Sequence, residues 1–263
     1  MSLAARAFPE AEGIAERHVL GMAEMGYVGL SEQWALKRAG DLHWRLIARA
    51  MGQAEAVFTC AEGRPLYAAF CASRLTLGDP AAPRLGGGLE LRARLYRVGR
   101  SRLGSLTELR VEGRVVGEIA LVSVFVGRSG EGAMVRRAPR VLAMPAAVSP
   151  ALEALAGTAA RAAGRARRWP ATAPGWGFTP TPAVDFNAAG LLYFPGFSAL
   201  SDRAVAAAGL ARAEPLRART VAYLGNVAPG EPVTVQPLAR RDGHLSLIRG
   251  GDDRLLAVLR ARY

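Results

Sequence analysis

Prolines are concentrated in one stretch of the chain, between about residues 145 and 182. Proline fixes φ and has no backbone N–H, so this density excludes a continuous helix or a central strand through the whole stretch. The six residues are Pro145, Pro150, Pro170, Pro174, Pro180 and Pro182. We therefore expect a domain over residues 1–145, a connector rich in Pro, Ala and Arg over 146–180, and a second domain over 181–263. A short Ala-rich helix is expected inside the connector, from Pro150 to Arg168.

The part before the connector has the pattern of one helix followed by several strands. Residues 31–51 carry apolar side chains at helical spacing, with a kink or break expected at Gly40–Asp41. Beyond them the period changes to two, which predicts strands at 66–77, 89–98, 103–111 and 115–126. Glu112–Gly113, between the last two of these runs, indicates a hairpin turn.

The part after the connector repeats this order in shorter form. A helix is expected within residues 191–208, beginning near Ser198 because Pro195–Gly196 interrupts the pattern. Strands are expected at 219–224, 232–238, 245–248 and 255–263, with a turn at 250–253 before the last. A helix followed by a run of strands therefore occurs both before and after the connector. This order predicts an α+β protein. The simplest such structure is a double hot-dog fold, in which each of two antiparallel sheets wraps a central helix.

The charge of the chain favours acidic partners. The sequence of 263 residues has 34 basic and 22 acidic residues, a net charge of +12, and 51% hydrophobic content, which rules out a disordered chain. The densest basic run, Arg161 to Arg168, has no interleaved aromatic residue before Trp169. Nucleic-acid binding usually combines such a run with aromatic side chains, so we do not expect it here.

Several other classes of protein are also disfavoured. The sequence has no apolar run long enough to span a membrane and no secretory signal, so we expect a cytoplasmic protein without a membrane partner. Cys60 and Cys71 are expected to be reduced thiols. His18, His43 and His244 are far apart in sequence and lack carboxylates at ligand spacing, so no metal is expected. The sequence also lacks a phosphate-binding loop and a dinucleotide fingerprint, so no bound cofactor is expected.

The first candidate site is the start of the first predicted helix. Ser31 has the position of an N-cap, and the free backbone N–H groups there can bind a thioester oxyanion or a carboxylate. Glu32 can act as a base, and Gly29, Leu30 and Trp34 are candidates for contact with substrate. The alternative is an ordinary capped helix, with Glu32 in its first turn.

Two further clusters contain polar or aromatic residues. His43 can act as an acid or base, although a buried and hydrogen-bonded core histidine is the more common case. Tyr67 lies in a predicted strand, and Asp185, Asn187 and Gly190 precede the second helix. Taken one at a time, a strand tyrosine is usually a core residue and Asp-x-Asn before glycine is usually a turn.

Three segments together resemble a known family. They are Gly21–Met25, Gly29–Trp34 and Gly40–Trp44, and the sequence there is similar to the N-terminal signature of the leinamycin-type bifunctional acyltransferase/decarboxylases of polyketide biosynthesis. The similarity is strongest over residues 18–52, continues loosely to about 130, and is faint beyond, apart from Asp185 to Tyr193. Members of that family have a double hot-dog fold.

The resemblance implies a reaction on acyl thioesters. A methylmalonyl-type group would pass from coenzyme A to the phosphopantetheine thiol of an acyl carrier protein and lose CO2, giving a propionyl carrier. The essential tyrosine of the family would correspond to Tyr67, in Arg64–Phe70. Decarboxylation builds negative charge on the thioester oxygen, so donors from Ser31 and its helix N-terminus and from Tyr67 would fit that step.

Two other functions remain open from the residues alone. One is a hot-dog thioesterase or dehydratase, in which Glu32, Asp185 or Asn187 positions water and Tyr67 is dispensable. The other is a non-catalytic scaffold that binds a carrier protein. In each case the positive charge would favour an acidic carrier or the phosphates of acyl-CoA, and the protein would be a monomer or homodimer.

Overall fold

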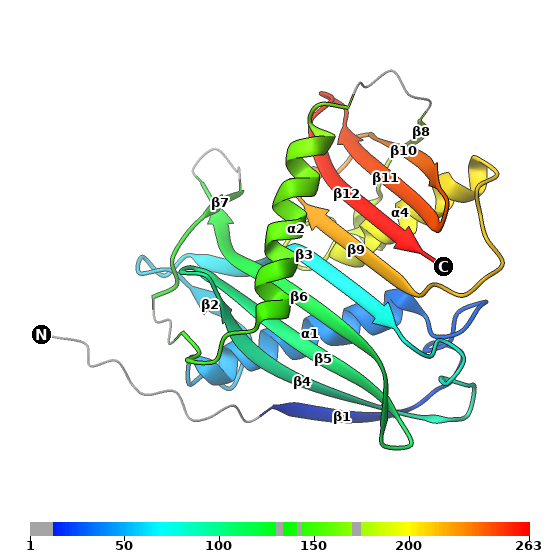
Figure 1. The fold of residues 1–263 in the computed structure, drawn as a ribbon. Helices are drawn as coiled ribbons and strands as arrows, with labels where there is room; N and C mark the ends of the chain where they lie inside the picture. Colours follow the sequence, from blue (N-terminus) through cyan, green and yellow to red (C-terminus); the bar gives the residue numbers. More distant parts are fainter. Residues whose placement is uncertain (1–12, 130–133, 141–143, 170–174) are drawn as a thin grey trace, which may run out of the picture.

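The computed structural model describes residues 13–129, 134–140, 144–169 and 175–263. The first twelve residues and two of the connector prolines, Pro170 and Pro174, lie outside the described residues. Figure 1 shows one large sheet, with helices α1 and α4 behind it in this view and helix α2 in front.

Helix α1 runs without interruption from Glu32 to Ala50, so the predicted break at Gly40–Asp41 is wrong. The Ser31 hydroxyl caps the helix by accepting from the backbone N–H of Trp34 at 3.3 Å. Gly40 has a packing role instead: a Cβ there would lie 2.9 Å from Cε1 of Phe194. The missing side chain therefore lets α1 approach helix α4 closely.

The first part of the chain forms the strands that the period-two pattern predicted. They are β3 (Pro65–Leu77), β4 (Gly88–Val98), β5 (Arg102–Val111) and β6 (Arg114–Arg128). Glu112 and Gly113 both have positive φ, at 49° and 78°, and form the predicted tight turn between β5 and β6. Strand β1 (Ile14–Val19) and the short strands β2 (Phe58–Thr59) and β7 (Met134–Arg136) were not predicted.

The second part again has a helix and strands. Helix α4 spans Phe194–Ala207 and begins four residues before the predicted start at Ser198, because Pro195 occupies its first turn, where proline is tolerated. The strands are β8 (Trp176–Phe178), β9 (Ala218–Tyr223), β10 (Val233–Arg240), β11 (Gly243–Gly250) and β12 (Leu255–Arg262). A single helical turn, α3 (Pro182–Asp185), precedes α4.

The connector contains the predicted Ala-rich helix. Helix α2 spans Pro150–Ala166, with Ser149 as N-cap and Pro150 at its first position. It crosses the face of the sheet opposite α1 and packs on β3, β6, β9 and β12, as Figure 1 shows. Because β3 and β6 come from the first part and β9 and β12 from the second, α2 spans both. The exact domain boundaries, 1–145, 146–180 and 181–263, stay a prediction.

The strands of both parts are hydrogen-bonded into one continuous sheet, where the sequence predicted two, because β3 and β9 pair at the seam. The order is β1-β4-β5-β6-β3-β9-β12-β11-β10-β8, with β2 beside β3 and β7 beside β6. The two parts meet where Ala72–Thr76 of β3 pairs antiparallel with Ala218–Ala222 of β9. Helix α1 packs on the strands of the first part and α4 on those of the second, which is the arrangement expected for a double hot dog.

His43 is a fully buried residue of α1, and both of its ring nitrogens are hydrogen-bonded to serines. Its Nδ1 lies 2.8 Å from Oγ of Ser105, and its Nε2 lies 2.8 Å from Oγ of Ser123. Burial lowers the pKa of His43 to about 3, so the ring stays neutral. The expectation of a satisfied core histidine is therefore confirmed, and the ring ties α1 to β5 and β6.

Candidate functional site

The main cavity lies where the seam between the two parts of the sheet opens. The pairing of β3 with β9 begins at Ala72 and Ala222, and β2 pairs only with Pro65 and Leu66. Between these two pairings, residues 67–70 of β3 pair with β6 on one side, Cys71 lies at a bulge, and none of the five residues pairs with a described strand on the other side. After β9, the backbone N–H groups of Leu224 and Gly225 donate to the carbonyl oxygen of Leu256, and these two residues line the cavity beside this edge.

The cavity has a volume of about 580 Å³, and its wall is mostly apolar. It draws its lining from β3, from α1, from the loop before α4 and from the chain that follows β9. Apolar and aromatic members include Trp44, Ala69, Val124, Leu192, Phe194 and Phe197. Such a volume with an apolar wall suits a small organic ligand or an acyl chain.

Tyr67 lies in the wall of this cavity, on the open edge of β3. Its ring is 6.5 Å from that of Trp44, and the indole N–H of Trp44 donates to the carbonyl oxygen of Ala68 at 3.1 Å. The Trp44 contact fixes α1 against the edge strand at this point. The position of Tyr67 beside a cavity therefore differs from that of an ordinary core tyrosine.

The loop before α4 forms another side of the cavity. Oδ1 of Asn187 accepts from the backbone N–H groups of Ala189 and Leu191, at 3.0 and 3.1 Å, so this amide oxygen is already used. Asn187 lines the cavity. Asp185 has a structural contact, since its carboxylate accepts from the N–H of Thr181 at 2.7 Å. Gly190 has φ of 67°, a conformation that favours glycine.

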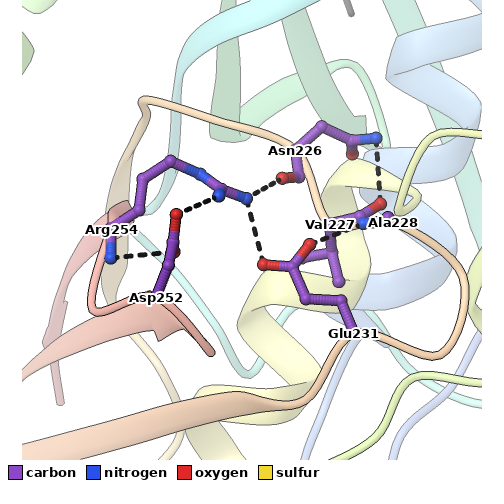
Figure 2. A network of polar contacts seen from close by, with 6 residues as sticks. All are labelled: Asn226, Val227, Ala228, Glu231, Asp252 and Arg254. Carbon is purple, nitrogen blue, oxygen red and sulfur yellow. Dashed lines mark hydrogen bonds and ion pairs between the residues drawn. The ribbon is translucent and has the colours of Figure 1, made fainter. Parts of the chain in front are cut away.

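Asn226 holds this loop against the chain that follows β9. Its Oδ1 accepts from the N–H of Leu192 at 2.9 Å, and its Nδ2 donates to the carbonyl of Val227 at 3.1 Å. Figure 2 shows how the Asn226 segment is fixed in turn: Arg254 donates to the Asn226 carbonyl at 3.1 Å and to Glu231 at 3.0 Å. Glu231 also accepts from the N–H of Ala228, so one side of the cavity is cross-linked by polar contacts.

A second, smaller pocket of about 270 Å³ lies at the start of α1. Gly29, Leu30, Ser31 and Glu32 line it, together with Asp202, Arg219 and Tyr263. The structure thus places the Ser31–Glu32 cluster and Tyr67 in separate pockets. Trp34 lines neither of the two pockets. Its ring packs edge-on against that of His18, with 5.1 Å between ring centroids.

Glu32 is held in a buried ion-pair network. Its Oε2 lies 3.1 Å from Nε of Arg219, whose Nη2 donates to Asp202 at 2.8 Å. Burial raises the pKa of Glu32, while Arg219 opposes that rise. For Arg219, burial disfavours the charge, but Glu32 and Asp202 raise its pKa, so it stays charged. A carboxylate held in this way is poorly placed to act as a free base.

The main cavity also contains polar and charged residues that were not predicted from the sequence, among them Asp41, Arg136, Tyr193, Tyr223 and Asn226. Asp41 had been interpreted as a helix break, but it contributes the carboxylate of the cavity wall within the described part of the chain. Burial raises the pKa of Tyr193, an effect that Asp41 increases and Arg38 reduces. Helical spacing places Asp41 three residues before Trp44 and on the same face, a signal that was available in the sequence.

Metal and membrane features can be stated for the described residues. In those residues, no three His, Cys, Asp or Glu side chains come together as a metal site. No helix among them is both long and apolar enough to cross a membrane. Cys60 and Cys71 are free thiols, as expected.

Solved structures similar to this chain show which fold it has. No protein-family model matches the sequence, and no curated protein matches it either. An acyl-ACP thioesterase from Bacteroides thetaiotaomicron superposes with a TM-score of 0.63 at 8% identity, over 95% of this chain and 97% of that one. A 12:0-ACP thioesterase from Umbellularia californica superposes with a TM-score of 0.69 at 10% identity, over 95% and 96%. The comparison confirms the double hot-dog fold over nearly the whole chain.

Proposed function

We propose that this protein is an enzyme that hydrolyses acyl thioesters carried by coenzyme A or by an acyl carrier protein. The observation that carries the proposal is the 580 Å³ apolar cavity at the opened seam, with three tyrosines, two asparagines and a carboxylate in its wall. The structural similarity to two acyl-ACP thioesterases supports the same class of substrate.

Hydrolysis needs a base for water and donors for the carbonyl oxygen. In our proposal, water attacks the thioester carbon, the C–S bond breaks, and the thiolate takes up a proton. The carboxylate of Asp41 is the candidate base. The hydroxyl of Tyr67 and the amide Nδ2 of Asn187 are candidate donors, because Oδ1 of Asn187 is occupied by two backbone N–H groups.

Among the water-positioning residues considered from sequence, the geometry favours Asn187. Glu32 is paired with Arg219 in the other pocket, and Asp185 caps the turn at Thr181. Asn187 lies in the wall of the main cavity together with Tyr67. We therefore keep Tyr67 in the proposed mechanism of hydrolysis.

A second candidate is the acyltransferase/decarboxylase reaction that the sequence resemblance implies. The position of Tyr67 in the cavity favours it, because the resemblance implies an essential tyrosine on this strand. Its acyl group would be of the methylmalonyl type, and its acceptor would be the phosphopantetheine thiol of a carrier protein. The second pocket would then have no part in the chemistry.

Product analysis separates the two reactions. The protein is incubated with methylmalonyl-CoA or a medium-chain acyl-CoA, with and without a holo carrier protein, and the products are identified by mass spectrometry. Free acid and free coenzyme A without acylated carrier support hydrolysis. Propionyl carrier supports transfer with decarboxylation and contradicts the main proposal, as does the absence of turnover with every thioester.

A further inference from the structure

The cavity has a positively charged rim on the side of strands β6 and β7. Arg136, at the end of β7, is part of the cavity wall. Arg128, at the end of β6, reaches over the opposite loop and donates to the carbonyl oxygen of Ala189 at 3.3 Å. Ala189 also lines the cavity, so guanidinium groups lie along the rim at two points.

The strand register places Arg136 on the same face as Tyr67. Tyr67 lies opposite Val126, and Val126 lies opposite Arg136 on its other side. Directly opposed residues of antiparallel strands have their side chains on one face, and neighbouring strands are about 4.8 Å apart. The Cα atoms of Tyr67 and Arg136 are therefore roughly 10 Å apart along one row of the sheet.

Arg102 adds a second cation near this row, because Leu103 of β5 pairs with Ser123 of β6 and Arg102 is therefore level with Val124 of the cavity wall. Cys71, another residue of the cavity wall, lies close enough to both Arg102 and Arg136 for their charges to act on its thiol. Burial raises the pKa of Cys71, and these two guanidinium groups oppose the rise. Two strands, β5 and β7, thus bring guanidinium groups towards Cys71, and of the two arginines Arg136 belongs to the cavity lining.

These two arginines have no acidic partner in the described part of the chain. Neither Arg102 nor Arg136 has a carboxylate within ion-pair distance there, whereas Arg38 and Arg45 on the α1 side both pair with Glu16. The carboxylate of the cavity wall, Asp41, lies on the α1 side and is flanked by Arg38 at 3.8 Å and Arg45 at 3.6 Å. The charges of Arg102 and Arg136 are therefore not neutralised by a described carboxylate at ion-pair distance.

We propose that Arg136, with Arg102 beside it, binds the phosphate of a phosphopantetheine arm whose thioester end enters the cavity beside Tyr67. This inference rests on the proposed function and extends it, because it selects the phosphorylated form of the thiol carrier. A guanidinium forms charge-assisted hydrogen bonds to phosphate oxygens, and both coenzyme A and a holo carrier protein present this group. An apolar cavity alone would accept pantetheine and phosphopantetheine equally.

Binding of non-reacting probes tests the inference without turnover. Isothermal titration calorimetry is performed at low salt with pantetheine, 4′-phosphopantetheine and coenzyme A. We expect phosphopantetheine to bind about tenfold more tightly than pantetheine, as one charged contact allows. The ratio of the affinity for phosphopantetheine to that for pantetheine should fall to near one in Arg136→Gln. In Arg102→Gln it should decrease only in part.

A matched control lies on the same sheet. Arg114 is at the other end of β6, twelve residues before Val126, which is roughly 40 Å along the strand. Arg114→Gln removes the same charge and should leave the ratio unchanged. Equal affinities of the wild-type protein for pantetheine and phosphopantetheine overturn the inference, as does an unchanged ratio in Arg136→Gln.

Coenzyme A, the third probe, distinguishes coenzyme A from a carrier protein as the source of the phosphate. Tighter binding of coenzyme A than of phosphopantetheine indicates that the nucleotide end is also bound, whereas equal binding favours a carrier protein; both results support the arginine site. Hydrolysis is measured separately in the same variants. Phosphate-dependent binding without hydrolysis rejects only the proposed function, and hydrolysis with phosphate-independent binding rejects only the arginine site.

Discussion

Glu32 and Arg219 form a buried ion pair that joins the two parts of the chain, with 3.1 Å between Oε2 and Nε. Glu32 begins helix α1, and Arg219 lies on β9, which is the strand of the second part at the seam. Asp202 of α4 completes the cluster. The pair therefore stabilises the contact between the parts of the double hot dog.

Removing the charge of Arg219 should destabilise the protein more than removing the charge of Glu32. Arg219→Met leaves Glu32 buried without a cation, which should lower the free energy of unfolding by about 3–5 kcal/mol. Glu32→Gln should cost less, about 1–2 kcal/mol, because Asp202 still pairs with Arg219. Urea denaturation measures both values. Loss of catalytic rate in a stably folded Glu32→Gln protein would contradict the separation of this pocket from the active one.

The buried His43 should make stability depend on pH. Its pKa is lowered to about 3 in the folded protein, against about 6.5 in the unfolded chain, so only the unfolded chain gains a proton between these values. Stability should therefore fall as pH falls below about 6.5. Burial also lowers the pKa of His244, to about 4, which acts in the same direction.

Urea denaturation between pH 4.5 and 5.5 isolates the His43 contribution. Its slope of stability against pH should be smaller in His43→Gln than in the wild-type protein by about 1.4 kcal/mol per pH unit. His244→Gln serves as the parallel variant and should reduce the slope in the same way. Identical slopes in wild type and His43→Gln would show that the unfolded and folded states bind equal numbers of protons at this site.

Tyr67→Phe should reduce turnover of acyl thioesters by about 10²–10³-fold while the fold persists, because one donor to the developing oxyanion is lost. Tyr96→Phe provides the control, since Tyr96 is a partly buried strand tyrosine that packs in the cluster under α2. Initial rates with acyl-CoA and thermal unfolding should be measured for both variants. Wild-type turnover in Tyr67→Phe would remove this hydroxyl from the mechanism.

Much of the fold was predictable because its signals are local. The helical period of residues 31–51 defines α1, and the period-two runs define strands β3 to β6. The Glu112–Gly113 pair marks the turn between β5 and β6. Gly40 could not be interpreted correctly in this way, since the reason for it is the ring of Phe194, about 150 residues later. Tertiary packing decided that position against local propensity.

The candidate site was only partly predictable for the same reason. Tyr67 and Asn187 were identified and do lie together in the main cavity, but Ser31 and Glu32 lie in another pocket. Sequence order gives no distance between a helix start and a strand edge. Asn226 was missed because its contact with Leu192 joins two loops that are adjacent only in the folded sheet.

The central claim, that the seam cavity holds the acyl group of a thioester, is tested most directly by narrowing the cavity. Ala69 lies in the wall on the open edge of β3, and Ala69→Phe adds a ring there. Hydrolysis rates of acyl-CoA thioesters are measured over a series of chain lengths for wild type and variant. We predict that the variant loses long-chain activity at least tenfold more than short-chain activity; an unchanged chain-length profile would contradict the claim.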